Sequence, residues 1–201
     1  MFLLTMPVLT RTLERWGVLY RWRAGMTLDL RGLSERPSLP PQYQLVEWDA
    51  LRLPEVAEVD YAAYEGSLDA RLYWRYFSSP GGCERMWREA IGGKFGRFDP
   101  RRTLLLLHEG RVCGDVMASM RTPHDAFIGN LAVLPEHRGG VGRALLLSCL
   151  WRYRSAGFQR VSLAVTLENQ RALRLYNSLG FATVGRFPLV TRPLPSRNGY
   201  R

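Results

Sequence analysis

Apolar residues occur along the chain in two patterns, short unbroken runs and longer stretches with helical spacing. The runs predict strands, and the spaced stretches predict helices. The predicted strands are residues 43–48, 103–108, 112–120, 127–134, 161–165 and 181–187. The predicted helices are residues 53–73 with a bend near Gly66-Ser67, then 84–91, 141–156 and 169–179, and residues 78–82 (SSPGG) predict a loop. This order predicts a mixed α and β fold around one sheet.

Two turn signals join three of the predicted strands. Glu109-Gly110 lies between the second and third runs, and Pro123-His124-Asp125 precedes the fourth. A short turn with glycine between two apolar runs is typical of a β-hairpin. We therefore predict an antiparallel meander, followed by alternating helices and strands.

The first 38 residues predict an addition to this domain. Four apolar residues recur there at helical spacing beside several arginines, namely Leu9, Leu13, Trp16 and Tyr20. This pattern is typical of a basic amphipathic helix, which packs on its own domain, docks a partner or contacts a membrane surface through residues 8–23. The Pro- and Ser-rich stretch SERPSLPPQ then predicts a linker. We expect an N-terminal extension over residues 1–38 and a single domain over residues 39–201.

Length and composition limit the class of protein. The chain has 201 residues, of which 46% are apolar and 23% charged, and this suits one globular domain rather than two independent cores. No apolar run reaches the roughly 18 residues of a transmembrane helix. The opening MFLLTMPVLT lacks the basic start and the cleavage site of a secretory signal. Because the three cysteines are widely spaced without a C-x-x-C pair, we expect a reduced, cytoplasmic protein without structural zinc or disulfides.

The charge balance favours anionic partners. A formal net charge of +10 suits a polyphosphate cofactor, a nucleic acid or an anionic surface. Residues 185–201 are basic without any acid, whereas residues 55–69 are acidic without any base. This distribution suits an anionic cofactor beside a cationic acceptor, although ordinary solvated surfaces explain each segment equally well. Nucleic acid is the less favoured partner, because no stripe of basic and aromatic residues occurs beyond the N-terminal helix.

A glycine-rich turn joins a predicted strand to a predicted helix. Residues 135–146 read PEHRGGVGRALL, and their glycines let the backbone turn and approach a ligand closely. The start of a helix presents free N–H groups and the positive end of its dipole, which suit a pyrophosphate, and Arg138 and Arg143 add positive charge. No Gly-Lys-Ser/Thr follows, so the turn is not a Walker A loop. Leu145 occupies the third glycine position of a dinucleotide fingerprint, which this turn therefore matches poorly.

A second motif begins the last predicted helix. Residues 169–181 read NQRALRLYNSLGF and follow the apolar run VSLAV. Helical spacing places Tyr176 on the core-facing stripe, in line with Ala172, Leu175 and Leu179. Taken alone, Asn169 is an ordinary helix N-cap and Tyr176 an ordinary buried aromatic residue.

Together the two motifs resemble those of the GCN5-related N-acetyltransferase (GNAT) superfamily. The order LAV-x-PEHRGGVGRALL, then N-x-x-A-x-x-LY-x-x-x-GF, is similar to both cofactor motifs of that family within residues 103–187. The resemblance implies a GNAT-like α/β (mixed α+β) fold, with a mixed, mostly antiparallel sheet flanked by helices. It also implies acetyl-CoA as co-substrate and no metal. The family turn usually starts with Gln or Arg; here either His137 stands in that place or Arg138 takes the role.

The resemblance also implies which residues bind acetyl-CoA. The backbone of Leu131, Ala132 and Val133 is implied to pair with the pantetheine arm and the thioester carbonyl. The amides along the turn are implied to hold the pyrophosphate, namely those of Arg138, Gly139, Gly140, Val141, Gly142, Arg143 and Ala144. Asn169 is implied to bind the arm or the intermediate. Tyr176 is implied to face the sulfur and to donate a proton or a hydrogen bond to the leaving thiolate.

The implied reaction is direct attack of a primary amine on the acetyl thioester. The acceptor is a small molecule, a protein N-terminus or an aminoacyl-tRNA, and a homodimer is compatible with the sequence. A lysine-like amine is mostly protonated at pH 7, so a general base is needed. The strand segment Ile128-Gly129-Asn130 carries no acid, and we select Glu65 as the base. The other candidates are Asp69, His124, Asp125, Glu168 and a water chain.

The missing strand carboxylate also supports an alternative function. A domain of this fold that binds CoA or acyl-CoA without catalysis is a regulatory module, and a fold alone does not prove activity. Asn169 and Tyr176 favour the N-acetyltransferase over this alternative.

Overall fold

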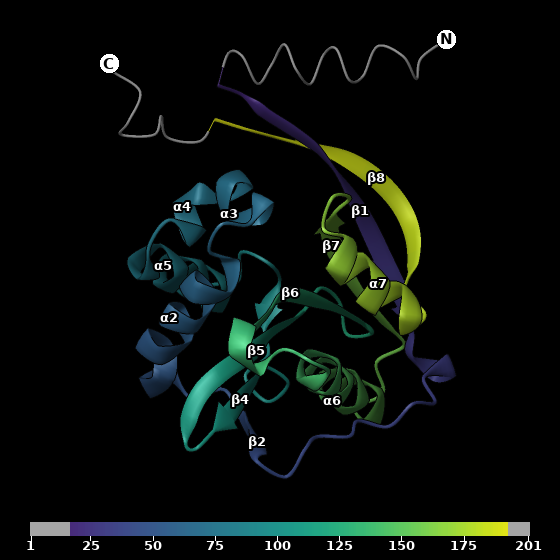
Figure 1. Cartoon of the computed structure of the whole chain (residues 1–201). Helices are drawn as coiled ribbons and strands as arrows, with labels where there is room; N and C mark the ends of the chain where they lie inside the picture. Colours follow the sequence, from purple (N-terminus) through teal and green to yellow (C-terminus); the bar gives the residue numbers. More distant parts are fainter. Residues whose placement is uncertain (1–16, 193–201) are drawn as a thin grey trace.

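The computed structural model describes residues 17–192, which form an eight-stranded sheet with helices on both faces (Figure 1). The strands are β1 (Leu19–Asp29), β2 (Tyr43–Glu47), β3 (Arg97–Phe98), β4 (Leu104–His108), β5 (Arg111–Met120), β6 (Asp125–Val133), β7 (Arg160–Thr166) and β8 (Ala182–Thr191). Their order is β2-β4-β5-β6-β7-β1-β8, with β3 paired to β5. All neighbouring strands are antiparallel except β6 and β7, which are parallel. The predicted mixed, mostly antiparallel sheet is confirmed.

Two groups of helices cover the sheet and form two hydrophobic cores. The helices are α2 (Leu53–Tyr64), α3 (Leu68–Leu72), α4 (Trp74–Phe77), α5 (Pro80–Ile91), α6 (Val141–Ser155) and α7 (Gln170–Ser178). Figure 1 shows α2 to α5 gathered on one side of the molecule, and α6 and α7 on the other. Because side chains alternate across a strand, β4 contributes to both cores. Leu104 and Leu106 pack in the core that contains α6, whereas Leu105 and Leu107 pack with α2 and α5.

The turns predicted between the central strands are present. Glu109 and Gly110 have φ angles of 50° and 78°, and two successive positive values are the geometry of a type I′ hairpin turn. β4, β5 and β6 therefore form the predicted antiparallel meander. The predicted bend at Gly66-Ser67 is also confirmed, since it separates α2 from α3.

The loop predicted at residues 78–82 is wrong in its second half. Helix α5 already begins at Pro80, where proline suits the first helical position. The Ser79 hydroxyl caps this helix by accepting a hydrogen bond from the Gly82 N–H at 3.2 Å. This position of the helix requires glycine, because a Cβ at Gly82 would lie 2.3 Å from the Tyr76 carbonyl oxygen.

The structure corrects the boundary predicted after residue 38. Residues 19–29 form β1, which lies inside the sheet between β7 and β8 rather than in an extension. Tyr20, expected at the end of a helix, is in this strand; the rest of the predicted helix, with Leu9, Leu13 and Trp16, lies outside the described residues. Within residues 17–192 no helix has the length and apolar character needed to cross a membrane.

The two parallel strands at the centre of the sheet separate soon after they meet. β6 pairs with β7 only from Asp125 to Phe127. The register between β5 and β6 then shifts, and Gly129 is left over as the extra residue of a β-bulge. A Cβ at Gly129 would lie 3.0 Å from the Met117 sulfur, so the bulge is closely packed. A bulge bends its strand, and β6 leaves β7 at this point.

The position of β1 in the core predicts a large effect of Met26→Ala. Met26 is 0% exposed and lies between β7 and β8, so removal of its side chain leaves a cavity. We expect a loss of about 2–5 kcal/mol in the free energy of unfolding, measured by denaturant titration. Val184→Ala on β8, where Val184 is 70% exposed, should change it by less than about 0.5 kcal/mol. Equal, small effects of the two substitutions would contradict the placement of β1.

Candidate active site

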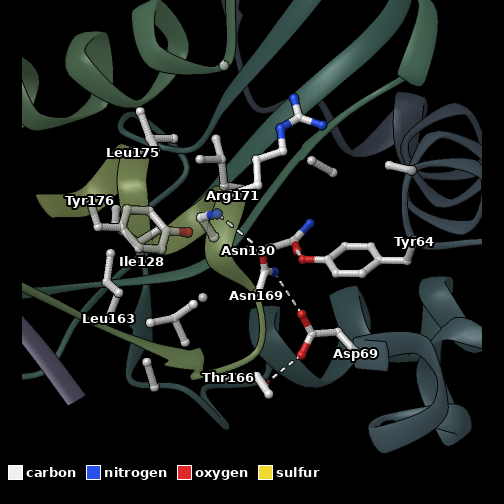
Figure 2. A pocket seen from close by; sticks show the side chains of 18 of the residues that line it. Tyr64, Asp69, Ile128, Asn130, Leu163, Thr166, Asn169, Arg171, Leu175 and Tyr176 are labelled. Carbon is white, nitrogen blue, oxygen red and sulfur yellow. Dashed lines mark hydrogen bonds between the residues drawn. The ribbon is translucent and has the colours of Figure 1, made fainter. Parts of the chain in front are cut away.

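A cavity of about 750 Å³ lies where β6 and β7 separate. Residues 127–133 of β6 and 163–166 of β7 form two of its walls. Strands β1 and β8 and several loops add other walls, and the helices add the side chains of Tyr64, Asp69, Arg171 and Tyr176. Figure 2 shows these side chains converging from both groups of helices, with Tyr64 and Tyr176 on opposite sides in this view. The divergence of two strands thus opens a cavity that most of the predicted site residues line.

On the cavity side of β6, two residues have backbone N–H and C=O groups that no neighbouring strand pairs. The Leu134 N–H donates to the Cys113 carbonyl at 2.9 Å, which fixes the phase of the ladder between β5 and β6. Hydrogen-bonded and non-hydrogen-bonded pairs alternate in an antiparallel ladder, so Leu131 and Val133 direct their N–H and C=O groups away from β5. Ala132 instead pairs with β5 through Asp115. All three residues line the cavity, but only Leu131 and Val133 direct their backbone groups away from β5, whereas those of Ala132 bond to β5.

The glycine-rich turn has the open amides expected of an anion site. Gly139 and Gly140 both have φ near 125°, a conformation that essentially only glycine adopts. Before and at the start of α6 the amides of Gly139, Gly140, Val141 and Gly142 find no backbone acceptor within residues 17–192. The predicted set is too large by three amides, because those of Arg138, Arg143 and Ala144 already donate to the carbonyls of Pro135 or Gly140.

Arginine side chains lie beside these amides. Arg138 donates to the carbonyls of Val133 at 3.3 Å and Ala63 at 2.9 Å and lines the cavity, whereas His137 contacts Tyr43 at 3.1 Å and does not. Of the two alternatives left by the sequence, the geometry therefore favours Arg138. Arg143 is held by Glu35 and Ser178.

Arg171 is a cation that the sequence reasoning did not single out. It is the second residue of α7 and lines the cavity, and burial together with the nearby Arg138 lowers its pKa. Neither Arg138 nor Arg171 forms an ion pair with a carboxylate in the part of the chain that the structure describes. Two unpaired guanidinium groups next to free helix amides form a site suited to a phosphate-rich anion.

Tyr176 contributes a buried hydroxyl group to the cavity. Its side chain is on α7 with 9% exposure, and its hydroxyl points into the cavity (Figure 2). Burial and the negative charge of Asp69 raise the pKa of Tyr176 to about 12, and the positive charge of Arg23 partly opposes this. The phenol therefore stays protonated at neutral pH and is available as a hydrogen-bond donor.

Asn169 has the position of a helix cap. Its Oδ1 accepts from the Ala172 N–H at 3.1 Å, and its Nδ2 donates to Asp69 at 2.9 Å. The other oxygen of Asp69 accepts from the Thr166 hydroxyl at 2.6 Å, as the dashed lines in Figure 2 show. Asn169 thus lines the cavity, but both polar atoms of its side chain already form hydrogen bonds within the protein.

The structure does not bring Glu65 to the cavity, which corrects its selection as general base. Helix α2 ends at Tyr64, and Glu65 follows as an exposed residue. Gly66 then reverses the chain with φ at 70°, and Ser67 caps α3 by accepting from the Ala70 N–H at 3.0 Å. This turn directs Asp69, an alternative candidate, into the cavity instead.

The remaining candidates for a base also lie elsewhere. His124 is exposed in a turn, Asp125 pairs with Arg160 at 2.8 Å, and Glu168 pairs with Arg21 at 3.4 Å. None of the three lines the cavity. Asp69 is therefore the candidate base that the geometry favours.

A buried acid pair beneath the cavity was not predicted from the sequence. Asp60 of α2 and Asp115 of β5 are both 0% exposed. Asn130 of β6 donates to Asp60 at 2.6 Å and to Asp115 at 2.9 Å, while its own carbonyl accepts from the Tyr64 hydroxyl at 2.9 Å. Trp87 donates to the second oxygen of Asp60 at 2.7 Å. Both N–H groups of Asn130 are thus fixed by acids, and this holds its oxygen toward Tyr64.

Burial determines the protonation of this pair. Burial raises the pKa of Asp60 to about 6, and burial together with the charge of Asp60 raises the pKa of Asp115 well above its ordinary range. Two adjacent buried carboxylates do not both ionise readily, so Asp115 carries the proton at neutral pH. One oxygen of Asp115 has no hydrogen-bond partner among the described residues, which fits a protonated, partly unsatisfied carboxyl group.

The fold and the site together define an acyltransferase-type α+β domain. Its sheet opens where β6 and β7 separate, and the free amides at the start of α6 lie beside this opening. The chain belongs to the acetyltransferase (GNAT) family, whose family model matches residues 70–181, more than half of the sequence. The resemblance predicted from the two motifs is therefore confirmed.

Individual relatives match the chain over part of their length. An uncharacterised N-acetyltransferase of Mycobacterium tuberculosis is 37% identical over 89 residues, which are 43% of this chain and 57% of that protein. A mycothiol acetyltransferase of Thermobispora bispora is 40% identical over 91 residues, which are 42% of this chain and 31% of that protein. The chain thus matches about half or less of the length of these relatives.

A solved structure has the same fold. The crystal structure of a GCN5-related N-acetyltransferase from Sphaerobacter thermophilus superimposes with a TM-score of 0.62 at 22% identity. The match covers 90% of this chain and 54% of that chain.

The acid pair predicts an unusual dependence of stability on pH. An unfolded aspartate titrates near pH 4, whereas Asp60 titrates at about 6 in the folded protein. The folded state therefore holds more protons than the unfolded state between these values, and the free energy of unfolding falls as pH rises through this window, by about 3 kcal/mol for Asp60. Asp115→Asn replaces the carboxyl group that folding keeps protonated with an amide of the same shape, which does not titrate. We expect this variant to be more stable than the wild type above pH 6 and to show a shallower decline.

Chemical unfolding at pH 4.5, 6 and 7.5 measures this difference. Asp125→Asn is the control, because Arg160 lowers the pKa of Asp125 and this carboxyl does not titrate in that range. It should leave the slope between pH 4.5 and 7.5 unchanged. A wild-type slope of zero or of opposite sign, or an equal slope in Asp115→Asn, would refute the raised pKa values of the acid pair.

Proposed function

We propose that the protein is an acetyl-CoA-dependent N-acetyltransferase that transfers the acetyl group directly to a primary amine. One observation carries the proposal: the unpaired backbone of β6 and the free amides of the glycine-rich turn open into the same cavity. The first suits an extended amide-containing arm, and the second suits a pyrophosphate. Acetyl-CoA combines both groups in one molecule.

The chain offers a place for each part of that molecule. The amides of Gly140, Val141 and Gly142 are the donors for the pyrophosphate, with Arg138 and Arg171 beside them. Leu131 and Val133 offer N–H and C=O groups to the amides of the pantetheine arm in the manner of a strand added to a sheet. Acetyl-CoA supplies a thioester, whose carbonyl carbon is open to attack by an amine.

Three groups of the chain then serve the transfer. Asp69 accepts hydrogen bonds from the acceptor ammonium, since each of its oxygens has a free lone pair, and takes one proton, which passes to solvent, so that the neutral amine attacks. Asp69 then takes the second N–H proton from the tetrahedral intermediate as the amide forms. The Val133 N–H faces the cavity and stabilises the oxyanion that forms on the thioester carbonyl. The new C–N bond is completed when the C–S bond breaks, and Tyr176 receives the departing thiolate as a hydrogen-bond donor.

The raised pKa of Tyr176 favours one of the two roles implied for it. A thiol titrates near 8.5 and Tyr176 at about 12, so full transfer of the phenol proton is uphill by roughly 3.5 pKa units. A hydrogen bond to the thiolate needs no such transfer. We therefore assign Tyr176 the role of a donor that stabilises the leaving group, while solvent supplies the final proton.

Tyr176→Phe tests this role. The substitution keeps the ring and removes the hydroxyl, so kcat should fall about 10- to 100-fold while the dissociation constant of acetyl-CoA changes less than about twofold. Tyr20→Phe, on β1 and absent from the cavity lining, is the matched control and should keep the wild-type kcat. An unchanged kcat in Tyr176→Phe would remove the hydroxyl from the reaction.

Gly140→Ala tests the anion site. Gly140 has φ of 125° and open space around its Cβ position, so the substitution strains the backbone without a clash. The strain of about 1–3 kcal/mol shifts the amides of the turn, and we expect the affinity for desulfo-CoA to fall about tenfold or more. Gly185→Ala also has open space but no positive φ, and it should bind as the wild type does. Equal affinities of all three proteins would contradict the site, and calorimetric titration measures them.

Release of free thiol from acetyl-CoA in the presence of primary amines tests the activity itself. The proposal expects amine-dependent release and an acetylated amine by mass spectrometry. Tight binding of acetyl-CoA without transfer to any amine would instead support the non-catalytic CoA-binding module.

A further inference from the structure

The cavity continues across the sheet into a second compartment. Val165 and Leu163 of β7 belong to the core that contains α6, so the alternating residues Ala164 and Thr166 face the opposite side. Arg23 of β1 is the cross-strand partner of Thr166 and shares its face. This compartment lies on the side of α2 to α5, opposite the face on which α6 and α7 pack.

Arg23 places a guanidinium group in this compartment. It donates to the Ala164 carbonyl at 2.5 Å and to the Tyr73 hydroxyl, and its carbon lies 5.2 Å from the centre of the Tyr73 ring. These contacts leave N–H groups of the guanidinium unused, and its buried Nε has no partner among the described residues. No carboxylate in residues 17–192 forms an ion pair with Arg23. A half-buried guanidinium with unused N–H groups and no acid partner is available to bind a ligand that carries an anion.

Asp69 supplies the opposite charge in the same compartment without pairing with Arg23. Both groups act on the same neighbours, because Asp69 raises and Arg23 lowers the pKa of Tyr73 and of Tyr176. Thr166 and Asn169 hold Asp69, and Ala164 and Tyr73 hold Arg23, so the two charges are fixed separately. Aromatic rings complete the lining, namely Tyr64, Tyr73, Tyr76, Phe95, Phe127 and Phe187.

We propose that the acceptor is an α-amino acid, whose carboxylate binds Arg23 and whose amine binds Asp69. A zwitterion brings one charge of each sign, as the compartment does, and the planar guanidinium matches a carboxylate with two parallel N–H donors. A plain amine satisfies Asp69 and leaves Arg23 without an anion. The aromatic lining suits an apolar or aromatic side chain. This inference rests on the proposed function, since it names the acceptor of the same site.

Binding to the protein saturated with desulfo-CoA tests the inference without requiring turnover. The ligands are L-phenylalanine and L-leucine, with phenethylamine and isoamylamine as the same molecules without the carboxylate, and calorimetry measures each dissociation constant. The wild type should bind each amino acid about tenfold or more tightly than its amine. Arg23→Gln should remove this preference, and Arg23→Lys should retain part of it, because lysine keeps the charge but not the planar fork.

Arg186→Gln is the matched control, since Arg186 is exposed on β8 and absent from the cavity lining. It should keep the wild-type preference for the amino acids, and melting temperatures establish that each variant is folded. Equal binding of amino acids and amines, failure of both amino acids to bind, or a preference that survives in Arg23→Gln would overturn the inference. The proposed function fails in a different way, when acetyl-CoA is bound but no amine of either kind is acetylated.

Discussion

The site depends on a single constraint, the β-bulge at Gly129. β6 is paired with β5 along its length, but after Phe127 the extra residue bends it away from β7. Without the bend, the backbone of Leu131 and Val133 would find partners in β7 and the cavity would close. With the bend, Leu131 and Val133 keep N–H and C=O groups that no neighbouring strand pairs, although the Val133 carbonyl accepts from the Arg138 side chain at 3.3 Å. Such groups are normally paired inside a protein, so the opening is favourable only if water or a ligand satisfies them.

Two further features hold this opening in shape. The glycine-rich turn after β6 places the start of α6 at one end, and Asp60, Asp115 and Asn130 form a hydrogen-bonded floor beneath it. A buried acid pair is a poor source of stability compared with an apolar core. Its contribution here is orientation, because it fixes the amide of Asn130 and through it the hydroxyl of Tyr64. β1 adds the charge on the acceptor side through Arg23.

Local signals in the sequence predicted most of the fold and those parts of the candidate site that neighbouring residues form. The hairpin at Glu109-Gly110, the glycine-rich turn and the Asn169 cap each depend on neighbouring residues, and the structure has all three. β1 was missed because its partners lie more than a hundred residues away, and strand pairing at that distance leaves no local pattern. The acid pair was missed for the same reason, although an aspartate inside the apolar run VCGDVMAS already departs from the pattern of a buried strand. Glu65 and Asp69 lie four residues apart, and only the turn between α2 and α3 decides which one faces the cavity.

Amide hydrogen exchange with and without desulfo-CoA tests the central claim most directly, since it reports on the backbone groups that the opening leaves free. The account predicts slower exchange on binding at Leu131, Val133 and the amides from Gly140 to Gly142, with no change at the N-terminal end of α2. Binding that leaves these amides unprotected, or that protects a different surface, would contradict the claim that the separation of β6 and β7 is the acetyl-CoA site.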